Sequence, residues 1–202
     1  MNVIEHYDRL IDEENDPVRD VPALKAYMDR WDGADFLDAM ELSKSKRVLE
    51  IGVGTGRLAV RVIPACREFV GIDLSPKTIA RAEENLSGMG EFSLVCGDFL
   101  TWETKNRFDV IYSSLTFLHL EDKRRAFFKA EELLLPGGRL VLSIDKNPAE
   151  WLDFETRRLR VFPDHPDVTA SRIEGAGLKL LRRWETEVAV IFVAKKERQD
   201  ED

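Results

Sequence analysis

Three closely spaced glycines give this sequence its clearest chemical signal. Gly52, Gly54 and Gly56 follow an apolar run and lead directly into an amphipathic segment. Glycines at a strand-to-helix junction permit a tight turn and a close approach of a ligand to the backbone, and the helix N-terminus offers unpaired N–H groups. The G-x-G-x-G pattern therefore predicts a binding loop for a small molecule, with a purely structural turn as the alternative.

Two acidic residues follow the next two apolar runs. Asp73 stands where a carboxylate can accept hydrogen bonds from both hydroxyls of a ribose. The alternative is that its negative charge only stabilises the N-terminus of the helix that follows. Asp98 is placed to pair with an exocyclic amine. Open α/β sheets bind ligands at the carboxyl ends of their parallel strands, so we expect the glycine loop and both acids to share one site.

The elements that must position these groups alternate regularly after residue 46. The predicted strands are 47–52, 69–73, 93–96, 108–112 and 139–144, and the predicted helices are 56–66, 76–87, 122–135 and 167–175. Near-continuous apolar strands joined by helices are typical of a parallel sheet covered on both faces. Ser75 before Pro76, and Asp122, are the predicted N-caps of two of these helices.

The last two predicted strands, 178–184 and 188–194, are separated by only three residues. Two parallel strands need a crossover of a dozen or more residues, so this pair must form an antiparallel hairpin. The predicted sheet is therefore mixed, with the hairpin at the C-terminal end of the chain.

Residues 1–45 are expected to form a helical appendage, with helices at 21–31 and 34–42. This segment is too small for a core of its own, so we expect it to pack over the main domain as a lid or to form a dimer interface. Residues 46–196 form the predicted main domain, and 197–202 a charged tail that frays.

The composition narrows the class of protein. Of the 202 residues, 44% are hydrophobic and 34% charged, which is typical of a globular chain, and the net charge of −8 disfavours nucleic-acid binding. The longest apolar runs fall well short of the roughly 18 residues of a membrane span, and the start lacks the features of a secretion signal, so we expect a cytoplasmic protein without membrane contact. Cys66 and Cys96 match no metal-binding or redox spacing, and no metal is expected.

Over residues 46–196 the sequence resembles the class I S-adenosylmethionine-dependent methyltransferases, of the small type 11/25-like kind. The resemblance rests on five stretches in the family's order: 48–56 (VLEIGVGTG), 71–75 (GIDLS), 97–99 (GDF), 108–114 (FDVIYSS) and 133–140 (LLLPGGRL). It implies a Rossmann-like α/β fold with a seven-stranded mixed sheet, whose seventh strand is inserted antiparallel. It also implies S-adenosylmethionine as cofactor and S-adenosylhomocysteine as product.

The resemblance assigns roles to individual residues. Asp73 would hold the ribose hydroxyls, Leu74 would pack against adenine, and Asp98 would receive the adenine amine. Other expected cofactor contacts are Glu50, Gly52, Gly54, Gly56 and Phe99, with Ser113 or Ser114 under the methionine part and Tyr7 and Tyr27 at its carboxylate end.

A methyl group on a sulfonium is already activated, so the protein mainly has to orient the reactants and exclude water, and no dedicated catalytic dyad is expected. His119, after the fourth strand, is the candidate general base; the alternative is that it shapes the turn before a helix. Acceptor contacts are expected from residues 1–45 and 145–166. Trp151, Phe154, Phe162 and His165 supply aromatic surface there, which predicts a small, partly apolar acceptor, with a protein acceptor as the alternative.

Two other classes stay open, and the chain is expected to be a monomer or a homodimer. One is a methyltransferase-like protein that holds the cofactor or its product without turnover. The other is a nicotinamide-dependent oxidoreductase. Arg57 disfavours the second, because the dinucleotide fingerprint G-x-G-x-x-G has its third glycine at that position.

Overall fold

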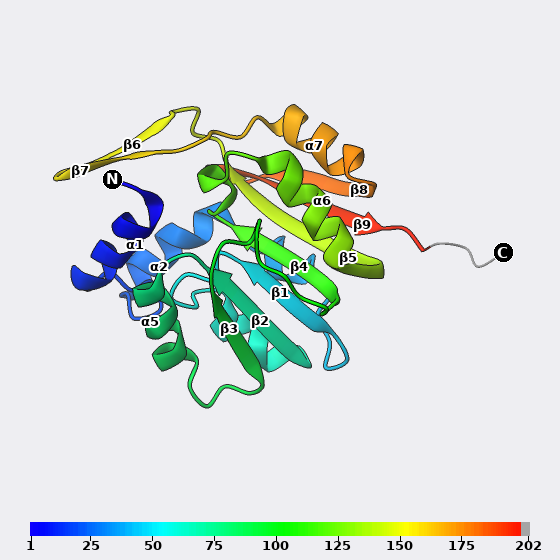
Figure 1. The fold of residues 1–202 in the computed structure, drawn as a ribbon, viewed down its shortest axis with the longest axis horizontal. Helices are drawn as coiled ribbons and strands as arrows, with labels where there is room; N and C mark the ends of the chain where they lie inside the picture. The colour runs from blue at the N-terminus through cyan, green and yellow to red at the C-terminus, as the bar shows by residue number, and fades with distance from the viewer. Residues whose placement is uncertain (199–202) are drawn as a thin grey trace.

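The computed structural model describes residues 1–198, whose centre is a seven-stranded sheet with the order β3-β2-β1-β4-β5-β9-β8 (Figure 1). The strands are β1 (Arg47–Ile51), β2 (Glu68–Asp73), β3 (Phe92–Cys96), β4 (Phe108–Ser114), β5 (Leu134–Asp145), β8 (Leu178–Glu185) and β9 (Ala189–Lys196). The first five are parallel, and β9 runs antiparallel to both β5 and β8. The predicted mixed sheet with an antiparallel terminal hairpin is confirmed.

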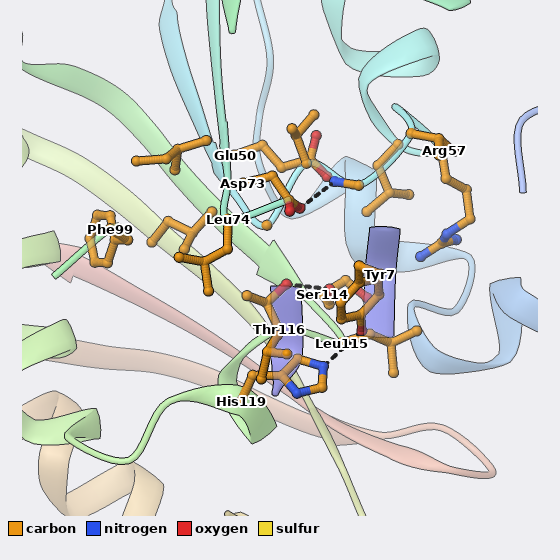
Figure 2. A pocket seen from close by; sticks show the side chains of 18 of the residues that line it. Tyr7, Glu50, Arg57, Asp73, Leu74, Phe99, Ser114, Leu115, Thr116 and His119 are labelled. Carbon is orange, nitrogen blue, oxygen red and sulfur yellow. Dashed lines mark hydrogen bonds between the residues drawn. The ribbon is translucent and has the colours of Figure 1, made fainter. Parts of the chain in front are cut away.

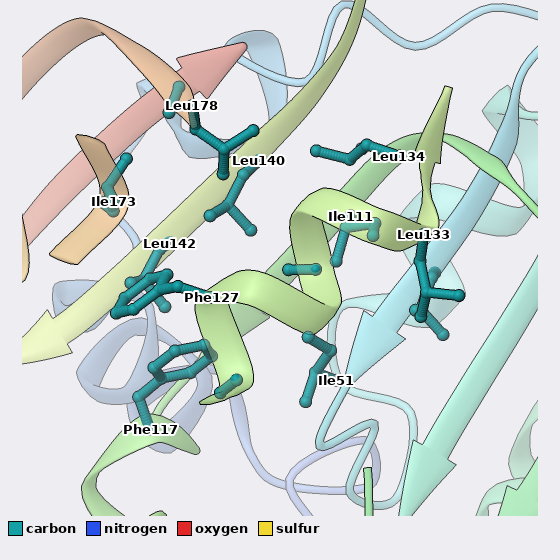
Figure 3. Close-up of a cluster of buried hydrophobic side chains, with 14 of the residues drawn as sticks. Ile51, Ile111, Phe117, Phe127, Leu133, Leu134, Leu140, Leu142, Ile173 and Leu178 are labelled. Atoms are coloured by element: carbon teal, nitrogen blue, oxygen red, sulfur yellow. The ribbon is translucent and has the colours of Figure 1, made fainter. Parts of the chain in front are cut away.

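Helices cover both faces of the sheet. They are α4 (Ala59–Val62), α5 (Pro76–Leu86), α6 (Lys123–Leu133) and α7 (Pro166–Gly175), and a short 3-10 helix, η2 (Ile63–Ala65), follows α4. Neighbouring residues of β1 belong to opposite cores: Val48 packs with α4 and α5, whereas Leu49 packs with the cluster under α6. Figure 3 shows that second cluster, with Phe127 of α6 beside Phe117 and Leu142. Burial of both faces explains the near-continuous apolar strands in the sequence.

The two predicted N-cap residues, Ser75 and Asp122, cap their helices as expected. The Ser75 hydroxyl accepts the N–H of Thr78, and the Asp122 carboxylate accepts the N–H of Arg125. The helix predicted at 56–66 is much shorter than expected. Pro64 has no N–H to donate to an earlier carbonyl, so the last turn tightens into η2.

The helix predicted at 122–135 ends at Leu133, and β5 begins at Leu134, five residues before its predicted start. Gly137, with φ of 82°, lets the strand pass through the Pro136–Gly138 turn signal without ending.

The N-terminal segment contains the helices α1 (Val3–Asp12), α2 (Pro22–Met28) and α3 (Asp35–Asp38) and the 3-10 helix η1 (Asp29–Trp31). A further 3-10 helix, η3 (Phe117–His119), follows β4. Helix α1 was not predicted, and the helix predicted at 34–42 stops at Asp38, before Glu41 adopts a positive φ. Helix α1 packs on the start of α5, where the Asp8 carboxylate accepts the Ser75 hydroxyl at 2.6 Å and the Lys77 N–H at 3.2 Å. This contact brings the N-terminal segment over the carboxyl end of β2.

A second, two-stranded sheet of β6 (Trp151–Phe154) and β7 (Arg157–Arg160) extends from the body next to α1 (Figure 1). Arg157 joins this hairpin to α1: Nη1 and Nη2 each lie 2.8 Å from the Glu13 carboxylate, and Nε donates to Nδ1 of His6 at 3.1 Å. The hairpin therefore braces α1 from outside.

Across residues 1–198, no helix combines the length and apolarity needed to cross a membrane. Of the predicted tail, residues 199–202 lie outside the described part of the chain.

Candidate functional site

A cleft of about 990 Å³, open to solvent, lies at the carboxyl ends of β1, β2 and β4 (Figure 2). This volume includes open solvent at the mouth of the cleft. One wall consists of the glycine loop and the strand ends, and the opposite wall comes from the N-terminal segment. That second wall contains Val3, Tyr7, Pro17 and Met28.

The glycine loop is shaped by positive backbone angles. Gly52 has φ of 77° and Gly54 has φ of 56°, in the left-handed region that favours glycine. A Cβ on Gly52 would lie 1.9 Å from Oγ1 of Thr116, so the loop packs directly against the turn after β4. A Cβ on Gly54 would meet nothing within 4 Å, because this glycine borders the open cleft.

Asp73 connects the loop to the second strand. Its Oδ2 accepts the N–H of Gly54 and its Oδ1 accepts that of Ser75, each at 3.0 Å. Burial raises the pKa of Asp73, while these backbone donors oppose the rise. Each carboxylate oxygen keeps a free lone pair for a ligand hydroxyl. Asp98 lines the cleft beyond β3 and is oriented by the Leu100 N–H, which donates to its Oδ1 at 2.8 Å.

Glu50 lies on the floor of the cleft. Its carboxylate is buried and accepts the Tyr112 hydroxyl at 2.7 Å. Burial raises the pKa of Glu50 to about 8, and the Tyr112 hydrogen bond and the positive charge of Arg57 oppose the rise.

The raised pKa of Glu50 predicts a pH-dependent stability. A carboxyl whose pKa is higher in the folded than in the unfolded chain contributes stability fully below its ordinary pKa of about 4.3, and loses it as the pH rises through its folded value. We expect Glu50→Gln to gain stability relative to the wild type as the pH rises from 5 to 9, measured by urea unfolding. Glu91→Gln, at an exposed position, is the control. A Glu50→Gln difference that stays constant over this range would contradict the raised pKa.

Tyr7 and His119 meet at the outer part of the cleft. The Tyr7 hydroxyl lies 2.7 Å from Nε2 of His119, and the rings are edge to face. Burial, together with the charges of His6 and Lys123, lowers the pKa of His119 to about 4, so the ring is neutral at pH 7. Burial, together with the negative charge of Asp73, raises the pKa of Tyr7, which stays protonated.

Most of the residues predicted for the site line this one cleft. They are Tyr7, Glu50, Gly52, Gly54, Asp73, Leu74, Asp98, Phe99, Ser114 and His119. Ser113, Gly56 and Tyr27 are not among the lining residues. The Ser113 hydroxyl points away into the sheet and donates to the Ile51 carbonyl, and a Cβ on Gly56 would meet Leu86 on the helix side. Tyr27 packs edge to face against Trp31 at the surface and is 49% exposed.

The aromatic residues expected to contact an acceptor, Trp151, Phe154, Phe162 and His165, do not line the cleft either. Phe154 instead packs on His6 with ring centroids 4.5 Å apart, so the hairpin supports the wall from behind. Lining residues that sequence reasoning missed include Val3, Pro17, Met28, Arg57, Leu115 and Thr116. Arg57 and Leu115 carried a usable signal, because each directly follows a strand end or loop already assigned to the site.

Comparisons with known proteins agree with the resemblance to methyltransferases that the sequence showed. Residues 48–138 match the family model of a methyltransferase domain. An uncharacterized methyltransferase of Bacillus thuringiensis (strain Al Hakam) is 39% identical over 111 residues, which are 54% of this chain and 51% of that protein. The match thus covers about half the length of this curated relative.

Two solved structures extend the likeness to the whole fold. The N-methyltransferase NodS from Bradyrhizobium japonicum WM9, in complex with S-adenosyl-L-homocysteine, has a TM-score of 0.74 at 20% identity, covering 97% of this chain and 99% of that one. The [4+2]-cyclase SpnF has a TM-score of 0.75 at 18% identity, covering 98% and 96%. At these identities the likeness concerns the fold, and the fold alone does not fix the reaction, since one of these proteins is a methyltransferase and the other a cyclase.

The seven-stranded mixed sheet with its glycine loop at the end of β1 is a Rossmann-like fold that this chain shares with the N-methyltransferase NodS. The match of residues 48–138 to a methyltransferase-domain model confirms the resemblance seen in the sequence. Among residues 1–198, no group of three or more His, Cys, Asp or Glu side chains is arranged to hold a metal ion.

Proposed function

We propose that this protein binds S-adenosylmethionine in the cleft and transfers its methyl group to a small, partly apolar acceptor, releasing S-adenosylhomocysteine. The observation that carries the proposal is the convergence of the glycine loop, Asp73 and Asp98 on one cleft. These groups come from three successive strand ends, where open α/β sheets bind their ligands.

The chemistry of the cleft fits this cofactor. The space beside Gly54 admits a ligand against the backbone, and Asp73 keeps acceptor lone pairs for two ribose hydroxyls. Asp98 offers a carboxylate for the adenine amine, with Leu74 and Phe99 as apolar neighbours for the base. Glu50 lies on the floor of the cleft, where a positively charged sulfur nearby would favour its ionised form over the protonated form that burial favours.

When bound, S-adenosylmethionine supplies a methyl group activated by a positively charged sulfur. The protein's task is then to hold the acceptor in line with the sulfur–methyl bond and to keep water out. Val3, Pro17 and Met28 form an apolar surface on the outer side of the cleft, which suits both tasks. We propose that residues 1–45 act as a lid over bound ligands, since this segment supplies the wall opposite the glycine loop.

The acceptor class follows from the same wall. Its side chains are apolar or neutral, because Tyr7 and His119 carry no charge at pH 7. A small molecule with an apolar part fits this surface, whereas the net charge of −8 disfavours a nucleic acid. We propose that the protein acts in the cytoplasm, as a monomer or a homodimer.

We expect His119→Ala to lower kcat by less than about tenfold. A positioned general base contributes about 10²- to 10⁴-fold, but a neutral imidazole whose pKa is about 4 is a weak base, and the methyl group is already activated. Tyr7→Phe is the matched control, because it removes the same hydrogen bond and leaves the imidazole in place. A loss of 100-fold or more in His119→Ala, with Tyr7→Phe near wild type, would instead establish His119 as the base.

Formation of S-adenosylhomocysteine from S-adenosylmethionine, measured against a panel of small amines, phenols, thiols and carboxylic acids, tests the proposed function. We expect at least one acceptor to raise the rate above the background of the protein alone. Tight binding of S-adenosylhomocysteine with no transfer to any class of acceptor would favour a protein that holds the cofactor without turnover.

A further inference from the structure

Arg157 of the β6–β7 hairpin is a buried arginine outside the cleft, and the proposed reaction does not explain it. Its side chain is 6% exposed, although the hairpin extends from the body of the protein (Figure 1). The guanidinium pairs with both oxygens of the Glu13 carboxylate at 2.8 Å, and Nε donates to Nδ1 of His6 at 3.1 Å. All three nitrogens therefore bind α1 or its C-cap residue, in a planar two-pronged contact that a lysine could not make.

His6 links this contact to the cleft. It is 2% exposed, and its ring centroid lies 4.5 Å from that of Phe154 in the hairpin and 5.1 Å, edge to face, from that of Tyr7. Tyr7 in turn lines the cleft and meets His119. A change in the contact between Arg157 and His6 therefore reaches the wall of the cleft through a single neighbouring side chain.

The contact requires a neutral His6 ring. Nδ1 accepts a hydrogen bond from Nε of Arg157, so it carries no proton in this arrangement. A protonated ring would place a second donor and a second positive charge against the guanidinium. The titratable and charged groups that face the ring are Arg157 on β7, Tyr7 and Glu13 on and directly after α1, and His119 after β4. Burial and the positive charge of Arg157 lower the pKa of His6, against the opposing charge of Glu13.

We propose that Arg157 is a positioning residue: by binding neutral His6 it keeps α1 where this helix walls the cleft, and protonation of His6 releases α1. The inference rests on the proposed function, since it treats α1 as the inner part of a lid over the ligand. The hairpin is then the outer part of the same lid. This role gives a reason for a two-stranded sheet that would be only marginally stable by itself.

The first measurement is the affinity for S-adenosylhomocysteine at pH 7.5, by calorimetry. Arg157→Gln should weaken binding by about fivefold or more, as is typical of coupling between separate sites. The variant should fold, because it leaves behind only the Glu13 carboxylate, whose side chain is 41% exposed. Arg158→Gln is the matched control on the same strand. Arg158 is 59% exposed and pairs with Asp153 within the hairpin, so its loss should leave the affinity unchanged.

The second measurement is the pH profile of the same affinity, which a merely structural role of Arg157 would not move. His6→Asn keeps an acceptor oxygen for Arg157 but does not titrate. An unperturbed histidine titrates near pH ~6.5, so from pH 7.5 to pH 5.5 the wild type should lose at least about threefold more affinity than His6→Asn. Asp73 and Glu50 are present in both proteins, so their titration cancels in this comparison.

Both losses together would establish that the hairpin acts on the cleft through Arg157 and His6. Equal affinities of Arg157→Gln and the wild type, or parallel pH profiles of the wild type and His6→Asn, would overturn this inference alone. Failure of the wild type to bind S-adenosylhomocysteine anywhere in this pH range would overturn the proposed function as well.

Discussion

Gly52→Ala is expected to destabilise the protein by about 2–5 kcal/mol and to abolish measurable binding of S-adenosylhomocysteine. A residue with a Cβ costs about 1–2 kcal/mol in the left-handed region, and Gly52 has φ of 77°. The added Cβ would also lie 1.9, 2.6 and 2.7 Å from three side-chain atoms of Thr116. Overpacking of this kind typically costs a further 1–3 kcal/mol, and it displaces the loop that borders the cleft.

Gly88→Ala separates the two contributions in Gly52→Ala. Gly88 has nearly the same φ, 79°, but a Cβ there would meet nothing within 4 Å, and the residue lies at the exposed end of α5. Urea unfolding should give a loss of about 1–2 kcal/mol for Gly88→Ala with unchanged ligand affinity. Equal losses of stability in the two variants would contradict the close contact between Gly52 and Thr116.

Asp73→Asn is expected to weaken binding of S-adenosylhomocysteine by about 100-fold or more. Hydrogen bonds to a charged group contribute about 1.5–3 kcal/mol each, and two ribose hydroxyls would lose a carboxylate partner. The substitution also leaves the amide N–H₂ facing one of the backbone donors, Gly54 or Ser75, so part of the loop loses its anchor. Calorimetric titration of the ligand measures the effect.

Asp109→Asn is the control for Asp73→Asn. The Asp109 carboxylate accepts the Arg47 N–H at 2.8 Å and so has a similar role in fixing the backbone, but at the amino ends of β1 and β4. We expect Asp109→Asn to lower the free energy of unfolding and leave the ligand affinity unchanged. If both variants lost affinity to the same extent, general destabilisation would account for the loss, and Asp73 would have no direct role.

The main domain could be predicted from the sequence because its signals are local. Apolar strand-length runs, the caps at Ser75 and Asp122, and the three-residue link before β9 each restrict the chain strongly. The shared position of Asp73 and Asp98 could be predicted for the same reason, because they stand at the ends of strands that are adjacent in the sheet. Position at a strand end was sufficient to place them.

The arrangement of the N-terminal wall of the cleft could not be predicted from local sequence signals, because its contacts join residues far apart in the chain. The capping box of Asn2 and Glu5 marks the start of α1 in the sequence, but nothing local shows that Tyr7 meets His119 or that Arg157 holds Glu13. The β6–β7 hairpin was missed because charged residues interrupt its short strands. Ser113 and Ser114 are consecutive and of the same type, and strand alternation decides which one faces the cleft.

The central claim, that the cleft binds S-adenosylmethionine and its product, is tested most directly by a thermal melt of the wild type with S-adenosylhomocysteine, with NAD as the control. A ligand at about 100 times its dissociation constant adds roughly 2.7 kcal/mol of stability. For a chain of this size each kcal/mol raises Tm by about 2–4 °C, so Tm should rise by about 5–11 °C with S-adenosylhomocysteine and stay unchanged with NAD. No rise with S-adenosylhomocysteine, or a rise with NAD alone, would contradict the account.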